Sequence, residues 1–88
     1  MKRNGKQQAV RRLRIAKGQI EGLERMVRQD QYCIDILRQS LAVKEALSSF
    51  ERVILQHHLD THVAEQMRKG EKAKSVKELL EIYRLSNK

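Results

Sequence analysis

Residues 33–62 read CIDILRQSLAVKEALSSFERVILQHHLDTH, and this stretch decides the fold. It contains no Gly or Pro, and its apolar residues recur at helical spacing, which predicts one long helix. Cys33 and His58 are 25 residues apart, or about 37 Å along a helix that rises about 1.5 Å per residue. One helix cannot close that distance on itself. Two antiparallel copies would place Cys33 of one chain beside His58 and His62 of the other.

These three side chains form a candidate metal-ligand set. His58 and His62 are four residues apart, so both rings project from one helix face at a spacing that can chelate a metal. Taken alone, such a pair is more often two surface histidines, and a lone Cys33 is more often a small buried hydrophobe. Antiparallel pairing favours the metal site, because its two-fold axis would fall near Ala46 and Leu47, where a small side chain permits close approach. The residues therefore predict a transition-metal site shared between subunits.

His57 lies next to this pair but is not expected to be a ligand, and catalysis is not expected either. His57 lies about 100° around an α-helix from His58, so we expect it at the rim or in solvent rather than as a ligand. Cys33 with a partner histidine resembles a thiol nucleophile pair. The sequence offers no orienting carboxylate or oxyanion loop to go with it, so we expect no enzyme activity.

The apolar pattern predicts three helices, at about residues 8–29, 31–69 and 73–85. Absence of Pro and an abundance of Ala, Leu, Glu, Lys, Arg and Gln agree with this. The expected fold is therefore all-α, a three-helix protomer with a long central helix in a single domain over residues 1–88. A chain this short buries little core alone, which favours oligomers.

Four residues are expected to mark the helix ends. Asp30 is a candidate N-cap of the central helix, and Gly70 is expected to end it. Ser75 is a candidate N-cap of the last helix, with Glu78 completing a capping box three residues later.

The charge points to a polyanionic partner. The chain carries a formal net charge of +8, and residues 1–29 hold nine Lys or Arg against two Glu. Such a concentration of basic residues is typical of nucleic-acid binding and, less often, of binding to an anionic membrane. The Arg side chains of the first segment lie on several helix faces, which makes a membrane-surface helix the weaker alternative.

The remaining composition indicates a compartment. A single cysteine cannot form an intrachain disulfide, which suits a reducing interior. No apolar run approaches the roughly 20 residues that a membrane helix needs, and the N-terminus lacks the pattern of a secretory signal. We expect a cytoplasmic protein without a membrane segment.

Several motifs resemble a known family. They are RLR at 12–14, GQIEG at 18–22, RMV at 25–27, YCIDIL at 32–37 and HLDTH at 58–62. Over about residues 10–85 the chain resembles the copper-sensing CsoR and nickel/cobalt-sensing RcnR repressors. The resemblance implies a tetramer of two antiparallel dimers that binds double-stranded operator DNA when metal-free. It also implies that metal loading releases the DNA and turns on efflux genes.

The resemblance assigns roles around the metal. Cys33 matches the family's thiolate ligand and His58 its histidine ligand. His62 falls where copper sensors usually have a second cysteine and nickel sensors a histidine. Tyr32 and Glu78 match outer residues that hydrogen-bond near the ligand histidine, as a metal-bound imidazole generally requires.

The identity of the metal follows from this donor set. One thiolate and two imidazoles suit Cu(I) in a trigonal site, whereas Zn(II) would prefer a fourth ligand. Nickel/cobalt sensors also use an N-terminal histidine, and no His precedes His57. We therefore expect a Cu(I)-responsive repressor, with a Ni(II)/Co(II) sensor on the same scaffold and a non-sensing helical adaptor as alternatives.

The resemblance also bears on DNA binding. Arg12 matches a basic residue implicated in DNA contact, whereas Ser49 stands where a second such arginine is expected, and Arg52 is its candidate replacement. The expected DNA-binding set is Arg11, Arg12, Arg14, Lys17 and Arg52. No helix-turn-helix or zinc-finger pattern is present, so we expect backbone contacts and shape readout to dominate.

Overall fold

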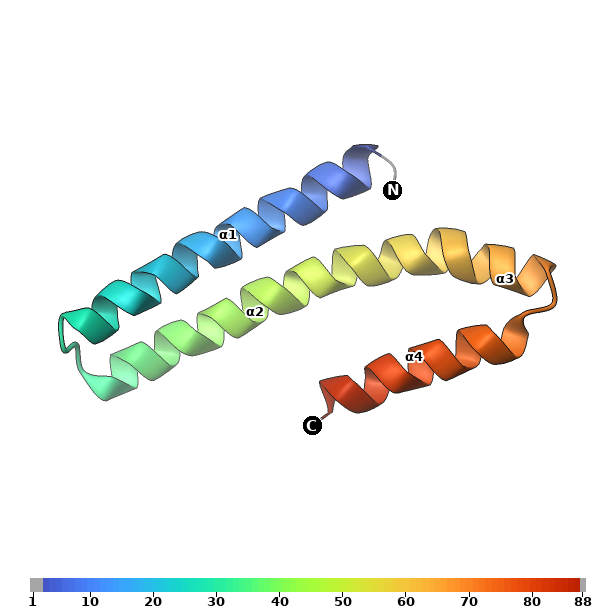
Figure 1. Cartoon of the computed structure of the whole chain (residues 1–88). Coiled ribbons are helices and arrows are strands. Elements are labelled where there is room, and N and C mark those ends of the chain that lie inside the picture. Colours follow the sequence, from blue (N-terminus) through green and yellow to red (C-terminus); the bar gives the residue numbers. More distant parts are fainter. Residues whose placement is uncertain (1–2, 88) are drawn as a thin grey trace. The chain divides into compact units, whose positions relative to one another are not determined.

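The computed structural model describes residues 3–87, and every element in that range is helical. The elements are α1 (Arg3–Arg28), α2 (Cys33–His58), the π-helical turn η1 (Leu59–Val63), α3 (Ala64–Arg68) and α4 (Lys72–Ser86), as Figure 1 shows. Helical backbone runs without interruption through α2, η1 and α3. This confirms the predicted all-α protomer with a long central helix. No helix in the described range is long and apolar enough to cross a membrane.

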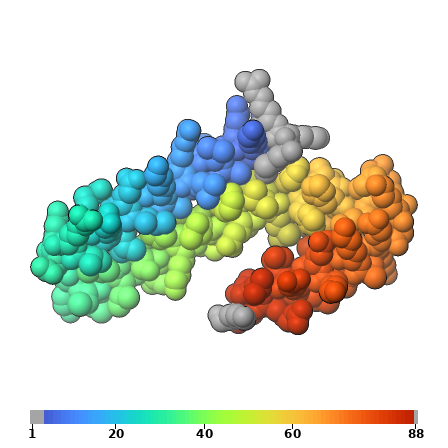
Figure 2. Space-filling model, in the orientation of Figure 1, coloured from blue at the N-terminus to red at the C-terminus, as the bar shows by residue number. Residues whose placement is uncertain are grey.

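The chain divides into two compact units, Met1–Leu55 and Gln56–Lys88. The single domain expected over residues 1–88 stays a prediction. In the first unit, α1 and α2 lie antiparallel and side by side (Figures 1 and 2). Ala9 and Ala16 on α1 and Val43 on α2 are buried there. The two alanines are seven residues apart and so share a helix face, which lets α1 approach α2 closely.

Most of the larger apolar side chains of these helices are exposed. Apolar residues at helical spacing form a stripe along each of these helices, and the exposed members include Leu13, Ile20, Ile34, Leu37, Leu41 and Ile54. A two-helix unit offers each of them one neighbouring helix at most, so the rest of each stripe stays uncovered. Contiguous exposed apolar surface of this kind is typical of an interaction site.

The turn after α1 corrects the prediction for Asp30. Asp30 has φ 53°, in the left-handed region, and its N–H donates to the Val27 carbonyl at 3.1 Å. The Gln31 N–H donates to the Met26 carbonyl at 3.0 Å. This pair of bonds is the Schellman motif, which satisfies the last carbonyls of a helix. Asp30 therefore ends α1 and does not cap α2.

The central helix begins two residues later than predicted. The Tyr32 carbonyl accepts hydrogen bonds from the N–H groups of Asp35 and Ile36, at 3.0 and 3.1 Å. These bonds place Tyr32 at the N-cap position and make Cys33 the first residue of α2.

Gly70 ends the central helical segment, as predicted. It has φ 75°, and its N–H donates to the Met67 carbonyl at 3.2 Å, while the Glu71 N–H donates to the Gln66 carbonyl at 2.7 Å. This is the same Schellman geometry, with glycine at the left-handed position that it tolerates best.

The predicted cap of the last helix is wrong. Helix α4 begins at Lys72 after Glu71, so Ser75 lies inside its first turn. Ser75 is fully buried, and its hydroxyl donates to the Gln66 Oε1 atom on α3. Gln66 Nε2 in turn donates to a Glu78 carboxylate oxygen at 3.3 Å. A buried hydroxyl needs a partner, and here the partner is Gln66, so Ser75 and Glu78 join α3 to α4 instead of forming a capping box.

Candidate metal centre and DNA-binding surface

The structure brings two of the three predicted ligands together. His58 is the last residue of α2, and His62 lies one turn later in η1. Their ring centroids are 5.3 Å apart and the ring planes are tilted by 32°. Because metal–nitrogen bonds are about 2 Å long, rings this close can offer nitrogens to one ion.

The helix is locally widened at this pair. Residues 59–63 adopt a π-helical turn, in which hydrogen bonds link residues five apart. Side-chain hydrogen bonds tie this turn to the end of α2: the Thr61 hydroxyl donates to the His57 carbonyl at 2.7 Å, and Gln56 Nε2 donates to the two Asp60 carboxylate oxygens at 3.0 and 3.1 Å. Such turns are frequent at functional sites.

The π-turn gives His57 a neighbour that α-helical geometry does not. His57 and His62 are five residues apart, and their ring centroids lie 5.8 Å apart, edge to face at 80°. His57 is half-buried. Half burial is compatible with the rim position expected for it, whereas the contact with His62 was not expected, because the expectation rested on ideal α-helix geometry. Nothing in the sequence marks a π-turn, so reasoning from spacing had no signal to find it.

The third predicted ligand lies at the opposite end of the same helix. Cys33 is the first residue of α2 and carries an exposed free thiol. The helix is continuous between Cys33 and His58, which keeps the axial separation at about 37 Å. Within residues 3–87, no three His, Cys, Asp or Glu side chains of one chain are grouped so that they could hold a metal ion.

The two predicted outer residues are also placed. Tyr32 precedes α2 and is 70% exposed. Glu78 lies on the first half of α4, where its carboxylate accepts the hydrogen bond from Gln66. The role of these residues beside a metal-bound His58 stays a prediction.

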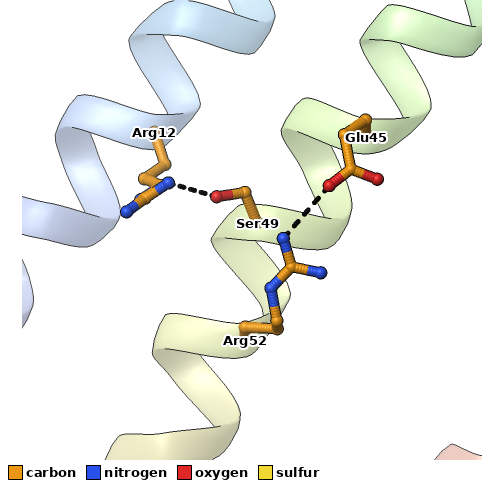
Figure 3. A network of polar contacts seen from close by, with 4 residues as sticks. All are labelled: Arg12, Glu45, Ser49 and Arg52. Carbon is orange, nitrogen blue, oxygen red and sulfur yellow. Dashed lines mark hydrogen bonds and ion pairs between the residues drawn. The ribbon is translucent and has the colours of Figure 1, made fainter.

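Two of the predicted DNA-binding residues each bond to a side chain of α2 in the first unit. Arg12 Nη1 on α1 donates to the Ser49 hydroxyl on α2, and Arg52 Nη2 pairs with Glu45 Oε1 at 3.1 Å. Figure 3 shows the four side chains together. Arg12 and Arg52 are therefore brought to one surface, which we call the Arg12–Arg52 surface: Arg12, Glu45, Ser49 and Arg52.

The other predicted DNA-binding residues lie along α1. Arg11, Arg14 and Lys17 are all exposed. Arg11 and Arg14 border a surface hollow to which Lys6 also contributes. Lys6 was missing from the predicted set, although it belongs to the basic N-terminal third whose charge was the signal.

The sequence is similar to that of known metal-sensing repressors. The family model described as "Metal-sensitive transcriptional repressor" matches residues 5–84. The copper-sensing transcriptional repressor CsoR of Bacillus subtilis is 34% identical over 79 residues, covering 90% of this chain and 78% of that protein. CsoR of Mycobacterium ulcerans is 32% identical over 81 residues, covering 92% of this chain and 69% of that protein.

A solved structure of a copper-sensing repressor is also similar to this chain. The crystal structure of the copper-sensing repressor CsoR with Cu(I) from Geobacillus thermodenitrificans matches with a TM-score of 0.89 and 31% sequence identity. The match covers 100% of this chain and 92% of that one. These relatives are regulators and not enzymes. The chain belongs to the metal-sensitive transcriptional repressor family.

Proposed function

We propose that this protein represses transcription by binding operator DNA when metal-free, and that Cu(I) binding releases the DNA to turn on metal efflux or homeostasis genes. The observation that carries the proposal is the pairing of His58 and His62 at 5.3 Å, with the one thiolate of the chain at the far end of the same helix. The copper-sensing relatives and the Cu(I)-bound structural neighbour support it. We place the repressor in the cytoplasm, where bacterial DNA lies.

The donor set fits Cu(I). Cys33, His58 and His62 supply one soft thiolate and two imidazoles, a combination that suits a soft monovalent ion in a three-coordinate site. Binding both imidazoles would fix the junction between α2 and η1, because His58 ends one element and His62 lies in the other. The residues we propose for orienting the His58 ring through its second nitrogen are Glu78 and Tyr32 of the partner subunit, because Tyr32 lies at the far end of α2 from the His58 of its own chain.

The proposed site requires two chains. An antiparallel dimer brings Cys33 of one chain to His58 and His62 of its partner, and two-fold symmetry then creates two equal sites. Exposed apolar residues along α2, among them Ile34, Leu37 and Leu41, supply surface for a second copy to bury. Two such dimers would assemble into the tetramer.

The proposed DNA contacts come from the first unit. Arg12 and Arg52, together with the exposed bases Arg11, Arg14 and Lys17, present positive charge that can neutralise backbone phosphates. Repetition of this surface in a tetramer would give one binding face several phosphate contacts.

The test is a metal titration of DNA-bound protein. Labelled operator DNA is bound to metal-free protein, and Cu(I), Ni(II), Co(II) or Zn(II) is added while fluorescence anisotropy reports release. We expect release at one equivalent of Cu(I) per chain. Release by Ni(II) or Co(II) alone would replace the copper assignment with the nickel/cobalt alternative, which the histidine at position 62 favours. DNA affinity that no metal changes would reject the metal-sensor proposal and favour the helical-adaptor alternative.

A further inference from the structure

The acidic member of the Arg12–Arg52 surface is unexpected in a DNA-binding patch. Glu45, Ser49 and Arg52 follow one another at spacings of four and three residues, which places them on one face of α2. The Glu45–Arg52 ion pair spans 3.1 Å, and the two side chains are 73% and 66% exposed. The pair is therefore open to solvent and to any ligand that reaches this face.

The other three residues present hydrogen-bond donors suited to a phosphate. Arginine guanidinium groups bind phosphate oxygens through parallel N–H donors. The Ser49 hydroxyl accepts a hydrogen bond from Arg12, and a hydroxyl that accepts in this way keeps its own proton to donate. Serine hydroxyls are common partners of backbone phosphates in DNA complexes. Arg12, Ser49 and Arg52 thus place donors from both helices on one small surface.

We propose that Arg12, Ser49 and Arg52 form a binding site for one DNA backbone phosphate, and that Glu45 is a resident competitor that this phosphate must displace from Arg52. The proposal rests on the proposed DNA binding and adds a residue that weakens it. The Glu45 carboxylate occupies Arg52 Nη2, one of the donors that a phosphate would use in a two-point contact with the guanidinium. The carboxylate also repels a phosphate bound to Arg52, because it lies 3.1 Å from that guanidinium, well within the Debye length of about 8 Å at physiological salt.

A charge-matched comparison tests this proposal. Glu45→Gln removes the competing charge and keeps the size of the side chain. Asp35→Asn is the matched control, because Asp35 is an exposed carboxylate on the same helix, paired with Arg38 at 3.5 Å. Binding of metal-free protein to fluorescein-labelled, mixed-sequence double-stranded DNA is measured at fixed salt. We expect Glu45→Gln to tighten binding at least three-fold more than Asp35→Asn does, with helix content by circular dichroism unchanged.

A double-mutant cycle assigns the effect to Arg52. In an Arg52→Gln background, Glu45→Gln should lose most of its advantage over Asp35→Asn, because no guanidinium is left to release and only the direct repulsion by the carboxylate remains. Equal tightening by Glu45→Gln and Asp35→Asn in the wild-type background would reduce the effect to overall charge and overturn the proposal. A full Glu45→Gln effect without Arg52 would also overturn it. Both results leave DNA binding intact, whereas failure of the wild-type protein to bind the DNA at low salt would overturn the proposed function itself.

Discussion

The imidazole rings of His58 and His62 lie 5.3 Å apart at the junction of α2 and η1, while Cys33 begins α2 at its other end. A long helix thus separates the thiolate from the imidazoles by most of its length. The same helix carries Ser49 and Arg52 on the proposed DNA-binding surface. The proposed metal ligands and the proposed DNA-binding residues are therefore different residues, which makes the two proposed functions separable by mutation.

Cys33→Ala should abolish release of DNA by Cu(I) and leave metal-free DNA binding within about two-fold of wild type, well under the tenfold change that 1.4 kcal/mol represents. The thiolate is the only soft donor of the proposed set, and it takes no part in the Arg12–Arg52 surface. Anisotropy titrations with and without Cu(I) measure both properties. Weak DNA binding by the metal-free variant would contradict the separation of roles.

Mixing two defective chains should rebuild up to half of the metal sites in each heterodimer. Neither Cys33→Ala nor the double variant His58→Ala, His62→Ala can complete a site in its own dimer. After subunit exchange, each heterodimer holds one intact site and one that lacks all three ligands, as two-fold symmetry requires. Cu(I) binding in competition with a chromophoric chelator measures the recovery, and native mass spectrometry confirms the heterodimers. No recovery in confirmed heterodimers would show that the ligands do not come from two antiparallel chains.

Arg12→Ala should weaken DNA binding and flatten its salt dependence. Each phosphate contact contributes roughly 0.9 to the slope of log affinity against log salt, so loss of one contact per protomer lowers the slope by that amount for every protomer on the DNA. Arg38→Ala is a suitable control. Arg38 pairs with Asp35, about three turns along α2 from Ser49, the partner of Arg12. Equal slopes for the two variants would remove Arg12 from the DNA contacts, and Cu(I) affinity should stay unchanged in both.

Thr61→Val should weaken Cu(I) binding several-fold without changing DNA affinity. The substitution keeps the shape of the side chain and deletes the hydroxyl that bonds to the His57 carbonyl at 2.7 Å beside the π-turn. Thr61→Ser retains the hydroxyl and should bind Cu(I) like wild type. The same chelator competition measures all three proteins. Equal loss in Thr61→Ser would mean that side-chain packing, and not the hydrogen bond, matters at this position.

Ser75→Ala should lower the stability of the protein by about 1 kcal/mol, the usual net worth of one hydrogen bond. Ser75 is fully buried, and its hydroxyl bonds to Gln66, so the substitution leaves Gln66 Oε1 without this donor. A change of that size lowers Tm by about 4–8 °C in a domain of this length. Ser86→Ala is the control, because Ser86 bonds to the Tyr83 carbonyl at an exposed position. Thermal unfolding followed by circular dichroism at 222 nm measures Tm for both variants. An equal fall in Tm for Ser75→Ala and Ser86→Ala would show that burial of the Ser75 hydroxyl does not matter.

Local rules correctly predicted the helices and one of their ends. Apolar spacing without Gly or Pro predicted the long central helix, and Gly70 ends its helical run because glycine tolerates the left-handed conformation of a Schellman turn. Asp30 also adopts that conformation and was assigned the wrong role. Aspartate serves both as an N-cap and in left-handed turns, so its type alone does not say which helix it belongs to.

The sequence by itself determined that this protein is a helical chain with a basic first third and with Cys33 far along one helix from His58 and His62. Those properties depend on residue type and spacing, which act locally. Only the tertiary structure decided that Ser75 is buried against Gln66, that Arg12 meets Ser49, and that a π-turn places His57 beside His62. The first two contacts join different helices, and the π-turn is a local widening of the backbone that helical periodicity does not encode. The two contacts between helices depend on which neighbour a polar group finds once the helices have packed.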